Sequence, residues 1–121
     1  MHWQIDNSRP VYIQIMEHIR SAVLTNEFPP GCRIPSVRDL ASTAKVNPNT
    51  MQRALTELEE EGLLISNGTL GRFVTKDDDI VGSIRREAIQ KTVQECAAQF
   101  RAIGLTMEEA ARLLLEEKEE G

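Results

Sequence analysis

The spacing of the apolar residues changes several times along this chain, and each change predicts a different secondary-structure element. Apolar residues recur three or four positions apart over residues 10–25, over a short stretch after residue 36, and over residues 47–62. Two short apolar runs follow, at 63–65 and 72–74, on either side of an Asn-Gly turn signal. The pattern predicts three helices and then a β-hairpin, whose loop is longer than two residues because three further residues intervene.

Residues that typically begin and end helices flank these stretches. We expect N-caps at Ser8, Ser36 and Asn47, prolines in the first turn at Pro10 and Pro48, and helix ends at Asn26 and Gly62. Asp39 is expected to complete a capping box with Ser36. Only a tight turn fits between Ala44 and Asn47, so the second and third helices must cross at a large angle, as in a helix-turn-helix.

The inward faces of these two helices follow from the same spacing. The residues expected inside are Val37, Leu40, Ala41, Ala44, Met51, Ala54, Leu55 and Leu58. Upstream of the first helix, Trp3-Gln4-Ile5 forms either a short strand or an arm packed on the domain. Three helices followed by a hairpin predict a winged helix-turn-helix, a fold that lays a helix across DNA.

Two further helices are predicted after the hairpin. A long helix runs from about residue 80 to 103, and a capping box of Thr106 and Glu109 opens a short last helix. Residues Met107, Ala110, Ala111 and Leu114 are expected on the inner face of the last helix. The acidic run 77–79 favours the start of the long helix, although it could instead bind a cation.

The long helix carries an apolar seam that repeats at alternating spacings of four and three. Its members are Ile89, Val93, Cys96, Phe100 and Ile103, and a second stripe is formed by Ile80, Ile84 and Ala88. Such a heptad-like seam predicts helix pairing between two copies of the chain. Packing of the seam on the last helix of the same chain is the alternative. We therefore predict a winged helix-turn-helix DNA-binding domain at residues 1–75 and a short helical dimerisation module at 76–121.

Net charge qualifies this interpretation without excluding it. The 121 residues carry a formal charge of −5, which alone would disfavour nucleic acid. Residues 1–75 hold seven Lys or Arg and eight Asp or Glu, a net of −1, whereas residues 76–121 hold seven and eleven, a net of −4. The acidity is concentrated outside the predicted DNA-binding domain, and the local field at the phosphates decides binding.

Several other classes of protein are disfavoured by the sequence. No apolar run approaches the ~20 residues that span a bilayer, and the N-terminus lacks the regions of a signal peptide. Cys32 and Cys96 have no metal-ligand spacing and are expected to be reduced thiols, so we expect a cytoplasmic location. With His2 and His18 the only histidines, no nucleophile-base set, phosphate loop or metal cluster is recognisable. We expect no enzymatic activity and no cofactor.

The start of the third helix has the residues that read base edges. Asn and Gln pair with adenine through two hydrogen bonds, Arg pairs with guanine, and Thr serves a phosphate or a methyl group. Asn49, Thr50, Gln52 and Arg53 are such residues, on the face opposite the apolar stripe. The alternative is a merely solvated helix face. Arg38, on the outer face of the second helix, is expected to contact DNA rather than form a surface ion pair with Asp39.

These motifs resemble the GntR family of bacterial transcription regulators, and specifically its small YtrA-like branch. The residues that carry the resemblance are Pro10-Val11-Tyr12-Ile13-Gln14-Ile15, Pro30-Gly31, Ile34-Pro35-Ser36-Val37-Arg38-Asp39-Leu40-Ala41, Val46-Asn47-Pro48-Asn49-Thr50, Arg53-Ala54-Leu55, Glu61-Gly62-Leu63 and Gly71-Arg72-Phe73-Val74. The resemblance implies operator contacts by the Arg of the Pro-Ser-x-Arg motif, by the start of the third helix and by the wing glycine. It departs at the wing, where Gly68 and Thr69 replace a basic residue and a glycine and where Arg72 replaces a threonine.

The expected fold is mainly α with a small β-hairpin, a winged helix-turn-helix followed by a two-helix C-terminal dimerisation module. The predicted DNA-binding residues are Ser36, Arg38, Asn47, Pro48, Asn49, Thr50, Gln52, Arg53, Gly71 and Arg72. The predicted function is that of a sequence-specific transcriptional regulator, a repressor by the resemblance, which binds double-stranded DNA at a palindromic operator as a homodimer. The alternatives are a protein-interaction adaptor that uses this fold without DNA, and a regulator with a small-molecule pocket at the dimer junction. The operator, the regulated genes, any effector and the sign of regulation are not encoded in a readable form.

Overall fold

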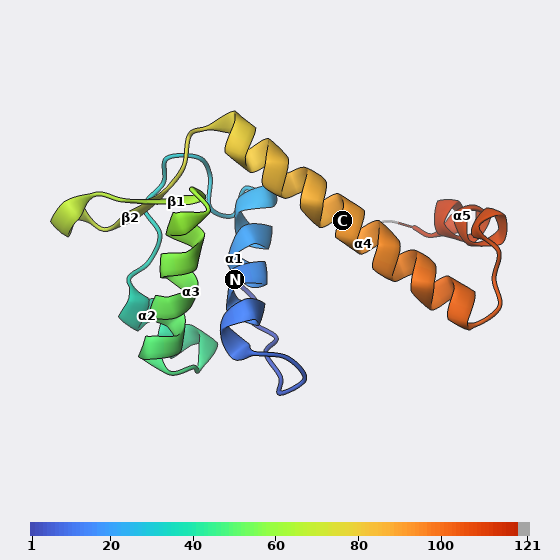
Figure 1. The fold of residues 1–121 in the computed structure, drawn as a ribbon, viewed down its shortest axis with the longest axis horizontal. Coiled ribbons are helices and arrows are strands. Elements are labelled where there is room, and N and C mark those ends of the chain that lie inside the picture. The colour runs from blue at the N-terminus through green and yellow to red at the C-terminus, as the bar shows by residue number, and fades with distance from the viewer. Residues whose placement is uncertain (119–121) are drawn as a thin grey trace. The chain divides into compact units, whose positions relative to one another are not determined.

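The computed structural model describes residues 1–118 and is mainly helical with one two-stranded antiparallel hairpin, as predicted (Figure 1). In chain order the elements are α1 (Val11–Leu24), α2 (Val37–Ala44), α3 (Pro48–Glu60), β1 (Leu64–Ser66), a 3₁₀ turn (Gly68–Leu70), β2 (Arg72–Val74), α4 (Asp78–Ala102) and α5 (Met107–Glu116). The chain forms two compact units, Met1–Ile84 and Arg85–Gly121. No helix in the described part is both long and apolar enough to cross a bilayer.

The start of α1 differs from the sequence prediction. Pro10 occupies the N-cap position and no side chain caps the helix, so the prediction that Ser8 is the N-cap is wrong. The Ser8 hydroxyl instead donates to the Asp6 carboxylate, which holds it in a local turn before the helix begins. Buried Gln14 closes this turn, because its amide N–H groups donate to the carbonyls of Asp6 and Arg9, both at 2.8 Å. A buried side chain of α1 therefore satisfies this loop in place of a helix cap.

The N-terminal residues form a packed arm, one of the two predicted alternatives. The Trp3 ring lies 5.2 Å from the His18 ring, centroid to centroid. The Gln4 backbone N–H donates to Nε2 of His18 at 3.3 Å. The arm is thereby held against α1.

The caps of α2 and α3 lie at the predicted residues. Oγ of Ser36 accepts from the Asp39 backbone N–H at 3.1 Å, and Oδ1 of Asn47 accepts from the Asn49 N–H at 2.8 Å. The full capping box expected for Ser36 is not formed, because no hydrogen bond in the described structure returns from the Asp39 carboxylate to the Ser36 backbone. Lys45 makes the tight turn between the helices with a left-handed backbone, φ 58°.

The hairpin has the predicted position and a longer loop than two residues. Leu64 pairs with Val74 and Ser66 with Arg72, and the 3₁₀ turn lies between the strands. A feature that the sequence did not predict is a third extended segment beside β2. Arg33 forms an isolated bridge with Phe73, and the Ile34 N–H donates to the Arg72 carbonyl at 3.0 Å. The chain before α2 is thus attached to the hairpin.

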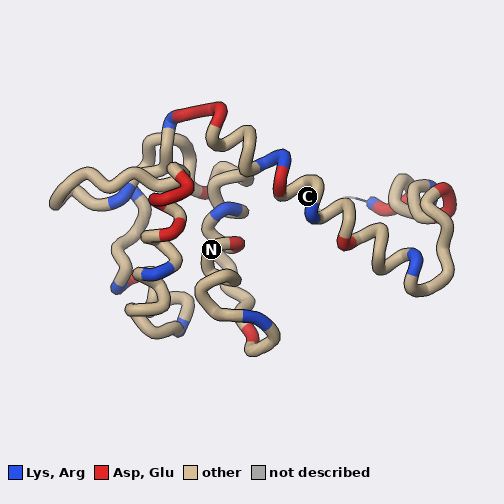
Figure 2. Tube along the Cα trace, in the orientation of Figure 1, with Lys and Arg blue, Asp and Glu red and all other residues tan. Residues whose placement is uncertain are grey.

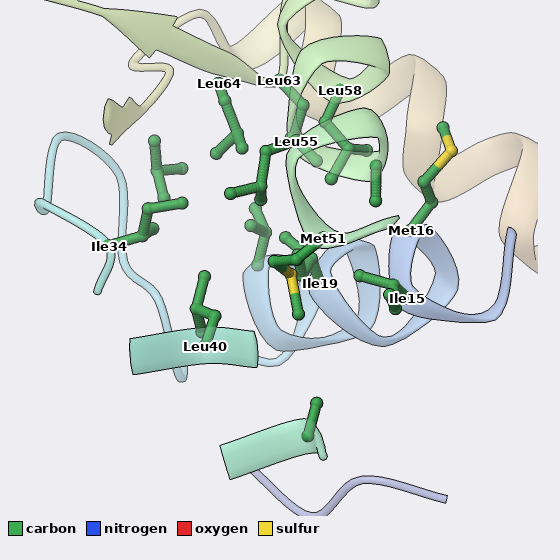
Figure 3. Close-up of a cluster of buried hydrophobic side chains, with 14 of the residues drawn as sticks. Ile15, Met16, Ile19, Ile34, Leu40, Met51, Leu55, Leu58, Leu63 and Leu64 are labelled. Atoms are coloured by element: carbon green, nitrogen blue, oxygen red, sulfur yellow. The ribbon is translucent and has the colours of Figure 1, made fainter. Parts of the chain in front are cut away.

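Aliphatic side chains from α1, α2, α3 and the hairpin meet in one core, with aromatic residues only at its edge (Figure 3). Ile15 and Ile19 of α1 face Met51, Leu55 and Leu58 of α3, and all five are fully buried. The predicted inward residues of α2 and α3 are buried except Val37, which is half-buried against the core. Burial of this stripe fixes the opposite face of α3 toward solvent.

The first turns of α4 belong to the same unit as the core. Val81 and Ile84 are half-buried against it, and a Cβ at Gly62 would lie 3.0 Å from Cδ1 of Ile80. Oδ1 of Asp77 accepts from the Asp79 N–H at 2.9 Å, which is the capping role favoured for the acidic run. The start of α4 is therefore held by the core that holds α3.

The second unit leaves most of its apolar residues exposed. The capping box of Thr106 and Glu109 is present as predicted. The prediction that Met107, Ala111 and Leu114 lie inside is wrong for the chain described here, because only Ala110 of that stripe is buried. The physical reason is that helical spacing reports which residues share a face, and not whether the same chain covers that face.

Candidate nucleic-acid interface

The N-terminal half of α3 presents its polar residues to solvent. Asn47, Pro48, Asn49, Gln52 and Arg53 are exposed, and Thr50 is half-buried. The Asn47 side chain and Pro48 account for the first turn, where a cap and a residue without an N–H are both favoured. The Gln52 amide donates to the hydroxyl of Thr56, one turn later, at 3.3 Å. These donors protrude because the Met51–Leu58 stripe on the other face is buried.

Arg53 is held by a residue of another helix. Its guanidinium carbon lies 3.6 Å from the centroid of the Tyr12 ring in α1, and its Nε lies 3.8 Å from a carboxylate oxygen of Glu57. The side chain is nevertheless 60% exposed. Stacking on an aromatic ring restricts Arg rotamers and leaves the outer edge of the guanidinium available. Sequence reasoning placed Tyr12 only in an apolar stripe and did not predict this contact.

Ser36 and Arg38 lie at the start of α2, and both are exposed. The Ser36 oxygen accepts the capping hydrogen bond, which leaves its own O–H free to donate outward. The alternative for Arg38 was an ion pair with Asp39 or a nearby Glu. No ion pair of Arg38 is present in the described residues, so its guanidinium is available to a ligand.

The two predicted wing residues have different environments. Gly71 has φ 109°, and a Cβ built there would lie 3.0 Å from Nε of Arg33, so a larger residue would be strained. Arg72 forms an ion pair with Glu59 of α3, and its side chain is only 18% exposed. The structure therefore places the charge of Arg72 against α3 rather than on the outside of the hairpin.

Acidic residues are confined to the C-terminal half of α3, where Figure 2 shows them along the helix. Glu59 and Glu61 are paired with Arg72 and Arg20 respectively. The exposed cations near the start of α3 and beside the wing are instead Arg33, Arg38, Lys45 and Arg53. This separation leaves the donor-rich end of α3 in a more positive field than the whole-chain charge suggests.

The cysteines add no reactive group to this surface. Both Cys32 and Cys96 are free thiols. Burial raises the pKa of the Cys32 thiol, which lowers the fraction of nucleophilic thiolate at neutral pH. Cys32 packs against the core beside the hairpin. Its environment is that of a packing residue.

The predicted dimerisation residues lie on α4, and most of them are uncovered. Ile89, Val93 and Ile103 are 56%, 60% and 75% exposed, whereas Cys96 and Phe100 are half-buried. Exposed leucines of α5 accompany them in the same unit, at Leu113, Leu114 and Leu115. A monomer rarely exposes so many large apolar side chains in one small unit unless they form an interface.

Comparison with known proteins identifies relatives over this fold. Residues 11–74 match the family described as bacterial regulatory proteins, gntR family. The chain is 34% identical over 106 residues to the uncharacterized HTH-type transcriptional regulator YhcF of Bacillus subtilis, covering 88% of each protein. It is 37% identical over 76 residues to the HTH-type transcriptional repressor YtrA of the same organism, covering 61% of this chain and 58% of YtrA.

Solved structures agree with these relatives. A GntR family transcriptional regulator from Listeria monocytogenes superposes with a TM-score of 0.84 at 26% identity, covering 94% of this chain and 100% of that one. AraR(DBD) in complex with operator ORX1, for which no organism is stated, has a TM-score of 0.54 at 27% identity, covering 62% of this chain and 99% of that one. The resemblance expected from the motifs, including that to the YtrA-like branch, is confirmed. The chain therefore belongs to the GntR family of bacterial regulatory proteins, which are DNA-binding regulators of transcription.

Proposed function

We propose that this protein represses transcription by binding a palindromic operator in double-stranded DNA as a homodimer, in the cytoplasm and without a cofactor. The observation that carries the proposal is the exposed, donor-rich start of α3, capped by Asn47 and held by its buried face. The relative YtrA is named a repressor, and AraR(DBD) was solved with an operator, which supports the same role here.

Base reading is assigned to the first turns of α3. Asn49 and Gln52 have the amides that pair with adenine, and Arg53 has the fork that pairs with guanine through two hydrogen bonds. Thr50, half-buried beside them, serves the backbone or a thymine methyl group. A recognition helix that enters the major groove with its N-terminal residues leading uses the same part of the helix.

Positioning on the phosphate backbone is assigned to the residues around α3. Ser36 and Arg38 donate from the start of α2, and the backbone N–H groups that follow Asn47 and Pro48 favour a phosphate. Gly71 allows the wing to approach the duplex closely, because it has no side chain. Arg72 serves the wing mainly through its ion pair with Glu59, since little of it is exposed.

Dimerisation is assigned to residues 76–121 and DNA binding to residues 1–75. The uncovered seam of Ile89, Val93 and Ile103 on α4 supports pairing of two chains, with Cys96 and Phe100 filling the spaces between them. Two DNA-binding units related by a two-fold axis match the two halves of a palindrome. Small units of this kind have too few contacts to bind a specific site alone.

Selection of bound fragments from genomic DNA tests the proposal directly. We expect the selected fragments to share an inverted repeat, and binding to weaken steeply between about 50 and 200 mM salt because condensed counterions are released. An adaptor protein that does not bind DNA would yield no shared sequence. That result would refute the proposal.

A matched pair of variants locates the reading residues. Gln52→Ala is expected to weaken binding to the selected duplex by about 1–3 kcal/mol, and to leave binding to an unrelated duplex unchanged. Gln94→Ala, an exposed Gln on the outer side of α4, is the control and is expected to bind like the wild type. Equal affinities of both variants for the selected duplex, at unchanged melting temperatures, would remove α3 from the proposed interface.

A further inference from the structure

We propose that Arg33 is the wing-side phosphate contact of this protein, in place of Arg72. Arg33 lies in the extended segment before α2 and was not among the residues predicted from the sequence. The proposal rests on the proposed function, because it assumes that the surface around α2, α3 and the hairpin faces DNA. It deepens that function by assigning one more residue to the backbone contacts.

The outer part of the hairpin has no basic side chain of its own. Residues 65–71, from β1 through the turn to Gly71, include neither Lys nor Arg. The one cation of β2, Arg72, is paired with Glu59 and largely covered. A phosphate that approaches the wing must therefore find its cation on another segment.

Arg33 is positioned for that role by backbone hydrogen bonds. It bridges to Phe73 of β2, and the residues on both sides of it are bonded to the hairpin as well. The Ile34 N–H donates to the Arg72 carbonyl at 3.0 Å, and the Val74 N–H donates to the Cys32 carbonyl at 2.9 Å. Such a backbone does not move freely, so the guanidinium is presented at a fixed place relative to the wing.

The side chain of Arg33 lies against the wing glycine and remains exposed. Its Nε, Cζ and Nη2 are 3.0 to 3.6 Å from the position that a Cβ of Gly71 would take. In the part of the chain that the structure describes, Arg33 forms no ion pair. An exposed and unpaired guanidinium retains all of its donors for a phosphate.

Arg33 also lines an open hollow that reaches the N-cap of α2. The hollow is bounded by Arg33, Ile34, Pro35, Ser36 and Asp39. The hydroxyl of Ser36 can donate into it, since that oxygen accepts only the Asp39 N–H. The carboxylate of Asp39 lines the same hollow and repels an anion, so the site would not attract a phosphate without the charge of Arg33.

The test is the salt dependence of DNA binding by Arg33→Gln, measured by fluorescence anisotropy on two duplexes. One duplex is the fragment selected above, and the other has an unrelated sequence. We expect the variant to bind both more weakly by the same factor, because phosphate contacts carry no sequence information. The slope of log affinity against log salt should fall by about 0.9 for each Arg33 engaged. Over a fourfold rise in salt, each lost contact makes the variant about 3.5-fold less sensitive than the wild type.

Two further variants serve as controls. Arg33→Lys keeps the charge and should restore most of the slope. Arg112→Gln removes an exposed Arg from α5, and therefore the same formal charge, and should leave the slope unchanged. Thermal melting of each variant checks folding, which an exposed side chain should not alter by more than about 0.5 kcal/mol.

The outcomes separate this inference from the proposed function. If the wild type binds neither duplex, the proposed function fails and the role of Arg33 fails with it. If the wild type binds but Arg33→Gln keeps its affinity and its slope, only the role of Arg33 is overturned. A loss confined to the selected duplex would overturn the phosphate assignment too, because it would show that Arg33 reads bases.

Discussion

Replacing Tyr12 by Leu should weaken DNA binding through Arg53, although Tyr12 itself is assigned no DNA contact. Leu retains an apolar side chain on α1 and removes the ring over which the guanidinium lies, 3.6 Å from its centroid. Because Arg53 is 60% exposed, the stacking energy belongs at the low end of the range for cation–π pairs, about 0.5–1 kcal/mol. Loss of that preorganisation predicts about 2- to 5-fold weaker binding to the selected duplex.

A double-mutant cycle measured by anisotropy is the appropriate assay. Tyr12→Phe keeps the ring and should bind like the wild type, and Tyr12→Leu in an Arg53→Gln background should add no further loss. An equal loss from Tyr12→Leu with and without Arg53 would refute the reasoning, because the effect would then come from a change in α1 itself. Melting curves of all the variants distinguish that case from unfolding.

Three further predictions concern stability and assembly. Glu59→Gln should lower the free energy of unfolding in urea by about 1 kcal/mol, because it leaves the covered Arg72 without its partner, whereas exposed Glu60→Gln should change it by less than about 0.5 kcal/mol. Lys45→Gly should be about 1 kcal/mol more stable than Lys45→Ala, since both remove the same charge and only Gly adopts φ 58° without strain; equal stabilities would contradict the strain argument. Val93→Glu should shift the mass measured by light scattering toward that of a 13.6 kDa monomer, and an unchanged mass would remove the α4 seam from the dimer.

Much of the helix-turn-helix could be predicted because its signals are local. Capping by Ser36 and Asn47 depends on residues two or three positions away, and the apolar stripe of α3 needs only helical spacing. The hairpin was predictable for the same reason, from a turn signal between two apolar runs. Where a local signal met a competitor, as when Asp6 took the Ser8 hydroxyl, the prediction was wrong.

The candidate site was predictable only in part. The donors at the start of α3 are contiguous in sequence, and burial of the opposite face places them outward. The environments of the arginines were not predictable, because each depends on a partner far away in the chain. Arg53 lies on Tyr12, Arg72 is paired with Glu59, and Arg33 lies against Gly71.

The sequence by itself determined where the helices and the hairpin begin, and which face of each is apolar, because caps, turns and periodicity act over a few residues. Only the tertiary structure decided which cation is available to a ligand, since Arg33 and Arg72 differ in their neighbours and not in their chemistry. The apolar face of α5 shows the same limit: its pattern requires a cover, and within the described chain only Ala110 has one. Short-range interactions choose the elements, whereas packing between distant segments chooses the environment of each side chain.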